Sequence, residues 1–247
     1  MIPASLIDEA EKLADDLRLN SRALDFLYSR SRYRSMPRAE WERNIRISAA
    51  LNQVMRRTKD GYDFKFFFDQ EATQNALESL RSPDGLLLLT CHGGFSRARR
   101  GFYRFLSTQQ FHLMRLGKKA IVEDQRQALF AALRTLQDGG AVQIAPDGPR
   151  GQQMSAPKIL GKAWQVGEGA GFLASTSECA TAWYSIVLDG QCFVPHVETG
   201  PQFKRGGSAD EFSERLYQFY ADRIEALLTG DPRNIVLGPR WARILIS

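Results

Sequence analysis

Cysteine is scarce in this sequence, and its spacing excludes two common uses. Among 247 residues there are three cysteines, Cys91, Cys179 and Cys192. An odd number without C-x-x-C spacing argues against a disulfide framework and against a structural zinc site. His112 and His196 have no companion cysteine or carboxylate at ligand spacing either. We therefore expect no metal and a reducing environment.

Long hydrophobic runs are also missing. No apolar stretch approaches the ~20 residues that a membrane-spanning helix needs. Residues 1–19 contain acidic side chains throughout, which excludes a signal peptide at this end. These absences predict a cytoplasmic location, with any membrane contact peripheral and on the inner face of the membrane.

The composition is that of a globular protein with a modest basic excess. The chain is 43% hydrophobic and 25% charged, and its formal net charge is +5. A positive field favours an acidic partner: an anionic lipid surface, an acidic carrier protein, coenzyme A phosphates or nucleic acid. The densest cluster is Arg97, Arg99 and Arg100, with Arg104 one turn further on, and a solvated helix face is the alternative interpretation. Nucleic acid is not expected, because the basic residues lack interleaved aromatic residues.

The first third of the chain has the pattern of amphipathic helices. Apolar residues from Leu6 onward recur at helical spacing, and Ser5 with Asp8 resembles a capping box. A short helix is expected after Asn20, and another after Pro37, which suits a first helical turn. We expect residues 1–60 to form a helical N-terminal subdomain packed on the core.

From residue 61 to 247 strands and helices alternate. A strand is expected over 62–68, and further strands over 86–90, 111–115, 141–145 and 183–188. Helices are expected over 71–80, 125–136, 163–177 and 211–228. This alternation predicts an α/β domain with a mixed, largely parallel sheet flanked by helices. The Asp189-Gly190 pair predicts a hairpin.

The first candidate site is His92, which follows the apolar strand directly. The carboxyl ends of strands are where open α/β sheets keep their ligand crevice. Gly93 and Gly94 leave room for a substrate near the backbone. An imidazole takes up a proton near neutral pH without a metal. The alternative is a loop histidine with a structural role.

The second candidate is the loop Pro146-Asp147-Gly148-Pro149-Arg150-Gly151, which follows another apolar strand. Its prolines and glycines predict a tight turn, and an arginine offers a donor fork that suits phosphate or carboxylate. A simple turn with a surface ion pair is the alternative. Two such loops at the ends of two strands in one sheet favour a shared site.

The order of these segments resembles the lysophospholipid acyltransferase superfamily. Residues 86–94 are similar to the first block of its lipid A acyltransferase branch, a strand that ends in H-x-G-N-W-E/D. Residues 140–151 are similar to the later block with P-D-G-P-R-G. Arg115 and Gly117, the segment 162–174 and the ending 220–241 resemble other parts of the family pattern, so the resemblance covers about residues 70–245.

The resemblance implies a glycerolipid acyltransferase-like fold and an acyltransferase activity. His92 would be the general base that deprotonates a hydroxyl or amine acceptor, a lipid or small molecule. The acceptor then attacks a thioester of coenzyme A or an acyl carrier protein, and no cofactor or metal is needed. Substrate-binding roles fall to Arg97, Arg115, Asp147, Gly148, Arg150 and Gly151.

One departure from the family pattern changes the expectation. The acid of the H-x-x-x-x-D/E motif is Arg97 here, and an arginine cannot orient His92 as a carboxylate does. Three explanations are open. Another carboxylate (Glu123, Asp124 or Asp147) supplies the role, or the acceptor is an amine that needs a weaker base. In the third, the chain is an inactive relative that binds an acyl chain, a carrier or a partner enzyme.

Overall fold

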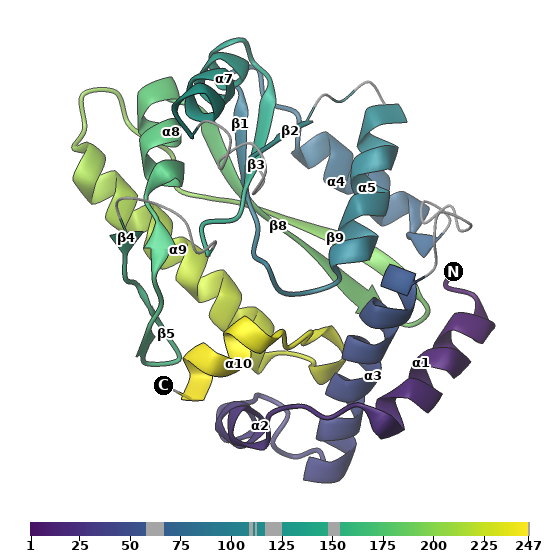
Figure 1. Cartoon of the computed structure of the whole chain (residues 1–247). Helices are drawn as coiled ribbons and strands as arrows, with labels where there is room; N and C mark the ends of the chain where they lie inside the picture. The colour runs from purple at the N-terminus through teal and green to yellow at the C-terminus, as the bar shows by residue number, and fades with distance from the viewer. Residues whose placement is uncertain (58–66, 109–110, 112, 117–124, 148–153, 247) are drawn as a thin grey trace.

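The computed structural model (Figure 1) describes residues 1–57, 67–108, 111, 113–116, 125–147 and 154–246. Its centre is a five-stranded sheet in the order β2-β3-β1-β8-β9. The strands are β1 (Leu86–Leu89), β2 (Leu113–Arg115), β3 (Ala141–Ile144), β8 (Ala180–Asp189) and β9 (Cys192–Thr199). Only the β8–β9 pair of this sheet is antiparallel, and the other neighbours run parallel. The predicted α/β class, with a mixed and largely parallel sheet, is confirmed.

Helices cover both faces of the sheet. On one face lie α7 (Gln125–Gln137), α8 (Gly169–Ser177), α9 (Ala209–Thr229) and α10 (Pro239–Ile246), and on the other α4 (Gln70–Ser79) and α5 (Ser96–Thr108). The four leucines of β1 are all buried. Leu87 and Leu89 pack into the first layer, while Leu86 and Leu88 pack into the second. This burial on both faces explains why a central parallel strand has no polar residue.

The N-terminal region forms three helices, as predicted: α1 (Ala4–Asp16), α2 (Ser21–Tyr28) and α3 (Arg38–Arg57). The Asn20 side chain accepts a hydrogen bond from the backbone N–H of Ala23 and so caps α2. The predicted capping box at Ser5 is wrong, because α1 already begins at Ala4 and no side chain caps it. Pro3 starts the helix instead, with a φ of −57° that suits a helical turn. The boundary at residue 60 falls outside the described residues and stays a prediction.

The segment 154–167 forms two short ladders, and the helix predicted over 163–177 is wrong in its first part. Strand β5 (Lys158–Ile159) pairs with β6 (Lys162–Ala163), and β4 (Met154–Ser155) pairs with β7 (Val166–Gly167). Leu160 and Gly161, at φ 53° and 77°, reverse the chain between β5 and β6. Only from Gly169 does the chain become helical. Most of the strand predicted over 62–68 lies outside the described residues.

Within the described residues, no helix combines the length and the apolar character needed to cross a membrane.

Candidate functional site

His92 lies at the carboxyl end of β1, where the chain leaves the sheet. The backbone N–H of Thr90 donates to the carbonyl of Ile144 at 3.0 Å, which continues the β1–β3 pairing past the end of the strand. Gly94 then adopts a φ of +72°, and α5 begins at Ser96. The His92 side chain is 55% exposed at this edge. Its position matches the crevice that parallel sheets form at their carboxyl ends.

Asp147 follows β3 and meets His92 across the same edge. Its Oδ1 lies 3.0 Å from His92 Nδ1, and its Oδ2 accepts a hydrogen bond from the His92 backbone N–H at 3.0 Å. The carbonyl of Pro146 accepts a hydrogen bond from Gly167 N–H at 2.8 Å, so β7 holds the loop in place. Asp147 is 1% exposed, whereas its partner faces solvent. One of the three carboxylates considered for the missing acid therefore contacts the imidazole.

Two further side chains donate to the same carboxylate. The Tyr220 hydroxyl of α9 lies 2.9 Å from Asp147 Oδ1, and Trp241 Nε1 of α10 lies 3.2 Å from Oδ2. Tyr220 also lies 3.2 Å from the carbonyl of Thr90. Both side chains are buried. Asp147 thus receives donors from its partner histidine and from two helices, which fixes the orientation of its carboxylate.

These contacts determine the charge of Asp147. Burial by itself raises the pKa of the carboxyl, but the hydrogen bonds and charge of His92, together with the Trp241 hydrogen bond, lower the pKa below its usual value. An ionised carboxylate only accepts hydrogen bonds, so His92 Nδ1 carries the proton. The lone pair of His92 is then on Nε2. Burial and the Asp147 charge raise the pKa of Tyr220, which keeps its hydroxyl a donor.

Close packing beside His92 and Asp147 requires a glycine at position 93. A Cβ at this position would lie 2.2 Å from Cη2 of Trp241. The Trp241 ring in turn meets Trp164 edge to face, with centroids 5.6 Å apart. Any larger residue at position 93 would displace the ring whose Nε1 holds Asp147.

The cysteine beside His92 is poorly suited to act as a nucleophile. Cys91 is 2% exposed, and burial together with the Asp147 charge raises the pKa of its thiol to about 12. Arg99 of α5 donates to Oγ1 of Thr90 at 2.6 Å and to the carbonyl of Cys91. This arginine ties the start of α5 to the end of β1.

The other site residues predicted from the sequence do not contact His92 or lie outside the described residues. Arg97 donates to the carbonyl of Arg56 at 3.1 Å, near the end of α3. The exposed Arg115 lies over the ring of Tyr103 at 5.3 Å. The remaining predictions lie outside the described residues: Gly148, Arg150, Gly151, Glu123 and Asp124. The structure therefore brings together His92 and Asp147, and leaves Arg97 in contact with α3.

Sequence reasoning missed the roles of Tyr220, Trp241 and Arg99. Tyr220 belongs to the apolar stripe of α9. In the sequence, only its hydroxyl group indicates that it contacts a polar group. Trp241 is distant in sequence from Asp147, so nothing local indicates their contact.

Among the described residues, no three histidine, cysteine or acidic side chains lie close enough together to hold a metal ion. No protein-family model matches the chain, and no curated protein matches it significantly. We therefore infer the function from the geometry of the site.

Proposed function

We propose that the chain is an acyltransferase that moves an acyl group from coenzyme A or an acyl carrier protein to a hydroxyl or amine acceptor. The observation that carries the proposal is the pairing of His92 with the buried Asp147 at the carboxyl edge of a parallel sheet. The acceptor is a lipid or a small molecule. In this proposal the protein works in the cytoplasm or peripherally on the inner face of the membrane.

The reaction needs one base and no covalent enzyme intermediate. Nε2 of His92 takes the proton of the acceptor hydroxyl or amine, and the acceptor atom attacks the thioester carbon. The C–S bond breaks, the new ester or amide forms, and the thiolate takes the proton from the imidazolium. Asp147 is a positioning residue that holds Nδ1–H and stabilises the imidazolium. The raised pKa of Cys91 supports direct transfer over a thiolate route.

The test compares wild type with His92→Ala on acyl-coenzyme A and acyl carrier protein donors and a mixed panel of acceptors. Thiol release and mass spectrometry of the products are the readouts. We expect acylated product from wild type and a loss of ~10²–10⁴-fold in kcat for the variant. Equal rates for the two proteins would contradict the proposal.

A second function is favoured by Arg97, which stands where the resembling family has its acid. In this alternative the chain is an inactive relative that binds an acyl chain, a carrier or a partner enzyme. Folded wild-type protein that binds donors without forming product would support it. The contact of Asp147 with His92 supports the catalytic proposal, because it supplies an acid for the imidazole.

A further inference from the structure

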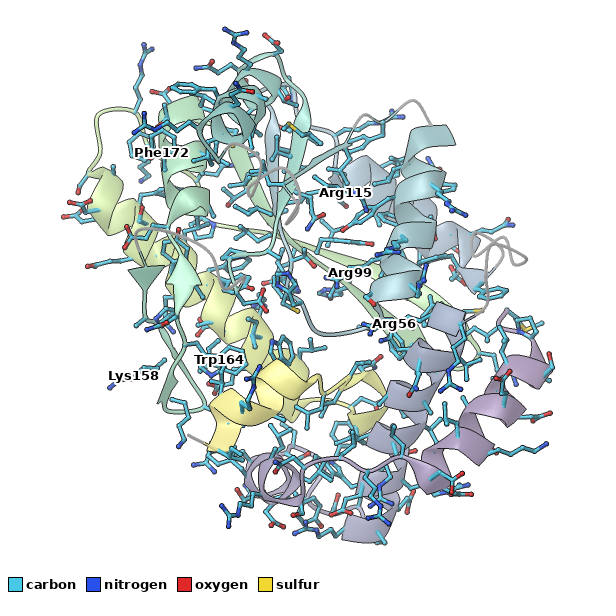
Figure 2. All side chains as sticks on the ribbon, in the orientation of Figure 1. Arg56, Arg99, Arg115, Lys158, Trp164 and Phe172 are labelled. Atoms are coloured by element: carbon cyan, nitrogen blue, oxygen red, sulfur yellow. The ribbon has the colours of Figure 1, made fainter. Side chains whose placement is uncertain are left out.

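A row of arginines runs along α5, next to the site. Arg97 and Arg100 are one turn apart on this helix. Arg56, at the end of α3, donates to Oγ of Ser96 at 3.0 Å, and Arg115 lies over Tyr103 at 5.3 Å, so both border α5. Figure 2 shows Arg115, Arg99 and Arg56 in succession beside the helix. We name four of these side chains the arginine patch: Arg56, Arg97, Arg100 and Arg115.

The arginine patch concentrates positive charge without compensation from the described residues. Within the described ranges, no carboxylate forms an ion pair with any member of the patch, whereas Arg38, Arg223 and Arg233 each pair with at least one carboxylate. Partial burial and then the charges of neighbouring arginines lower the pKa of Arg100. Three members are exposed and Arg97 is half-buried. Like charges held this close repel one another, and an acidic partner would relieve that repulsion.

We propose that the arginine patch is the docking surface for an acidic carrier protein that brings the acyl thioester to His92. The inference rests on the proposed acyl transfer, and it selects the carrier-bound donor over free coenzyme A. α5 begins four residues after His92, so a protein bound to this helix lies next to the site. Charge complementarity of this kind speeds encounter and fixes the orientation of the partner.

The distribution of apolar side chains favours a protein over a membrane as the partner. Among the described residues, the two most exposed phenylalanines are Phe130, 65% exposed on α7, and Phe172, 50% exposed on α8. These helices cover the opposite face of the sheet from α5, and Figure 2 shows Phe172 well away from Arg56 and Arg115. A bilayer surface would be held by basic and inserting apolar side chains on one face. The arginine patch has no such apolar companion among the described residues.

Binding is measured first, since it does not depend on catalysis. Fluorescence anisotropy reports the affinity of labelled, acylated carrier protein for wild type and for Arg56→Glu/Arg100→Glu. The matched control is Arg22→Glu/Arg126→Glu, which changes the net charge equally at exposed positions on α2 and α7. We expect at least a roughly tenfold loss of affinity for the patch variant only, and weaker wild-type binding as salt rises. Equal affinities for the patch and control variants would overturn the proposal.

Kinetic measurements, together with binding to lipid vesicles and to DNA, distinguish the carrier from the other acidic partners. With acylated carrier protein, KM should rise at least about tenfold in the patch variant, while rates with uncharged acyl-pantetheine stay unchanged. If the patch variant lost affinity equally for acyl-coenzyme A and for the carrier, the patch would bind nucleotide phosphates. If it lost affinity only for vesicles of phosphatidylglycerol, the patch would bind a membrane. If it lost affinity only for random DNA, the patch would bind nucleic acid. Each of these results overturns the carrier proposal. If no donor reacts but carrier binding still needs the patch, acyl transfer fails while the docking surface stands.

Discussion

A carboxylate with four donor groups around it has little freedom to rotate, and Asp147 is in that position. The donors are the backbone and ring N–H of His92, the hydroxyl of Tyr220 and the indole of Trp241. The backbone N–H and the indole cannot accept a hydrogen bond, so an asparagine would turn its NH₂ group toward His92 Nδ1 and the Tyr220 hydroxyl. Nδ1 would then have to accept, and the ring proton would move to Nε2. The site therefore needs an ionised acid at this residue, not merely a side chain of similar shape.

Asp147→Asn should lower kcat by roughly two to four orders of magnitude, because an amide cannot hold His92 Nδ1–H and stabilise the imidazolium. Acyl transfer rates at saturating donor and acceptor measure the effect. Asp138→Asn, at an exposed position after α7, is the matched control and should keep wild-type activity. Full activity of the Asp147 variant would show that another group orients His92.

Tyr220→Phe removes one donor from Asp147 and leaves the ring in place. We expect kcat/KM to fall about tenfold, the effect of one hydrogen bond of ~1.4 kcal/mol to a charged acceptor. Tyr217→Phe is the control, since the Tyr217 hydroxyl contacts Gly167 and Gly171 and not Asp147. Urea unfolding should show both variants destabilised, with activity lost only in the first. A similar loss of activity in both would reduce Tyr220 to a structural role.

The sequence alone predicts part of this site. His92 after an apolar strand and Asp147 in a tight loop after another are recognisable, because chain position indicates which edge of the sheet they share. From the sequence, Asp147 is one of three possible acids. The choice depends on Tyr220 and Trp241, which belong to α9 and α10 and come near only through tertiary packing.

At the scale of elements, α10 closes the site by packing against the turn after β1. The contact is between the Trp241 ring and Gly93, and it tolerates no side chain on the glycine.

The hairpin of β5 and β6 shows where element prediction failed. Buried Trp164 and Val166 alternate with exposed Ala163 and Gln165, a period of two that continues directly into α8. Because this alternation is short, the sequence predicts a helix from residue 163, whereas α8 begins at Gly169.

Gly93→Ala should destabilise the protein by ~1–3 kcal/mol, because the new methyl group overlaps the Trp241 ring. Activity should fall as well, since displacement of the ring moves its Nε1 away from Asp147. Urea unfolding of Gly93→Ala, Trp241→Phe and the double variant gives the coupling between the two positions. The smaller phenylalanine ring should recover part of the loss. Additive effects would show that the two residues do not meet.

At the scale of the whole molecule, parallel pairing brings distant segments to one edge. Leu89 of β1 lies opposite Ile144 of β3, so the loops that carry His92 and Asp147 emerge side by side. The helices on one face then supply Tyr220 and Trp241, and α5 on the other face contributes Arg97 and Arg100 to the arginine patch. Because these contacts lower the pKa of Asp147, we expect the free energy of unfolding to depend on the ionisation of this buried acid.

The pKa of Asp147 is lowered in the folded protein, from an ordinary value of 3.8. A lowered pKa means that the folded state favours the ionised form, so Asp147 contributes stability above that ordinary value. This contribution is lost as the pH falls through the lower, folded pKa. The free energy of unfolding of wild type should therefore exceed that of Asp147→Asn at pH 7, and the gap should narrow below about pH 4. Urea denaturation at pH 7, 5, 4 and 3 measures the gap, and the difference between the proteins cancels the titration of shared carboxylates. A gap that stays constant across this range would show that the folded and unfolded states bind the Asp147 proton equally, and the carboxylate would then owe its position to packing and not to its charge.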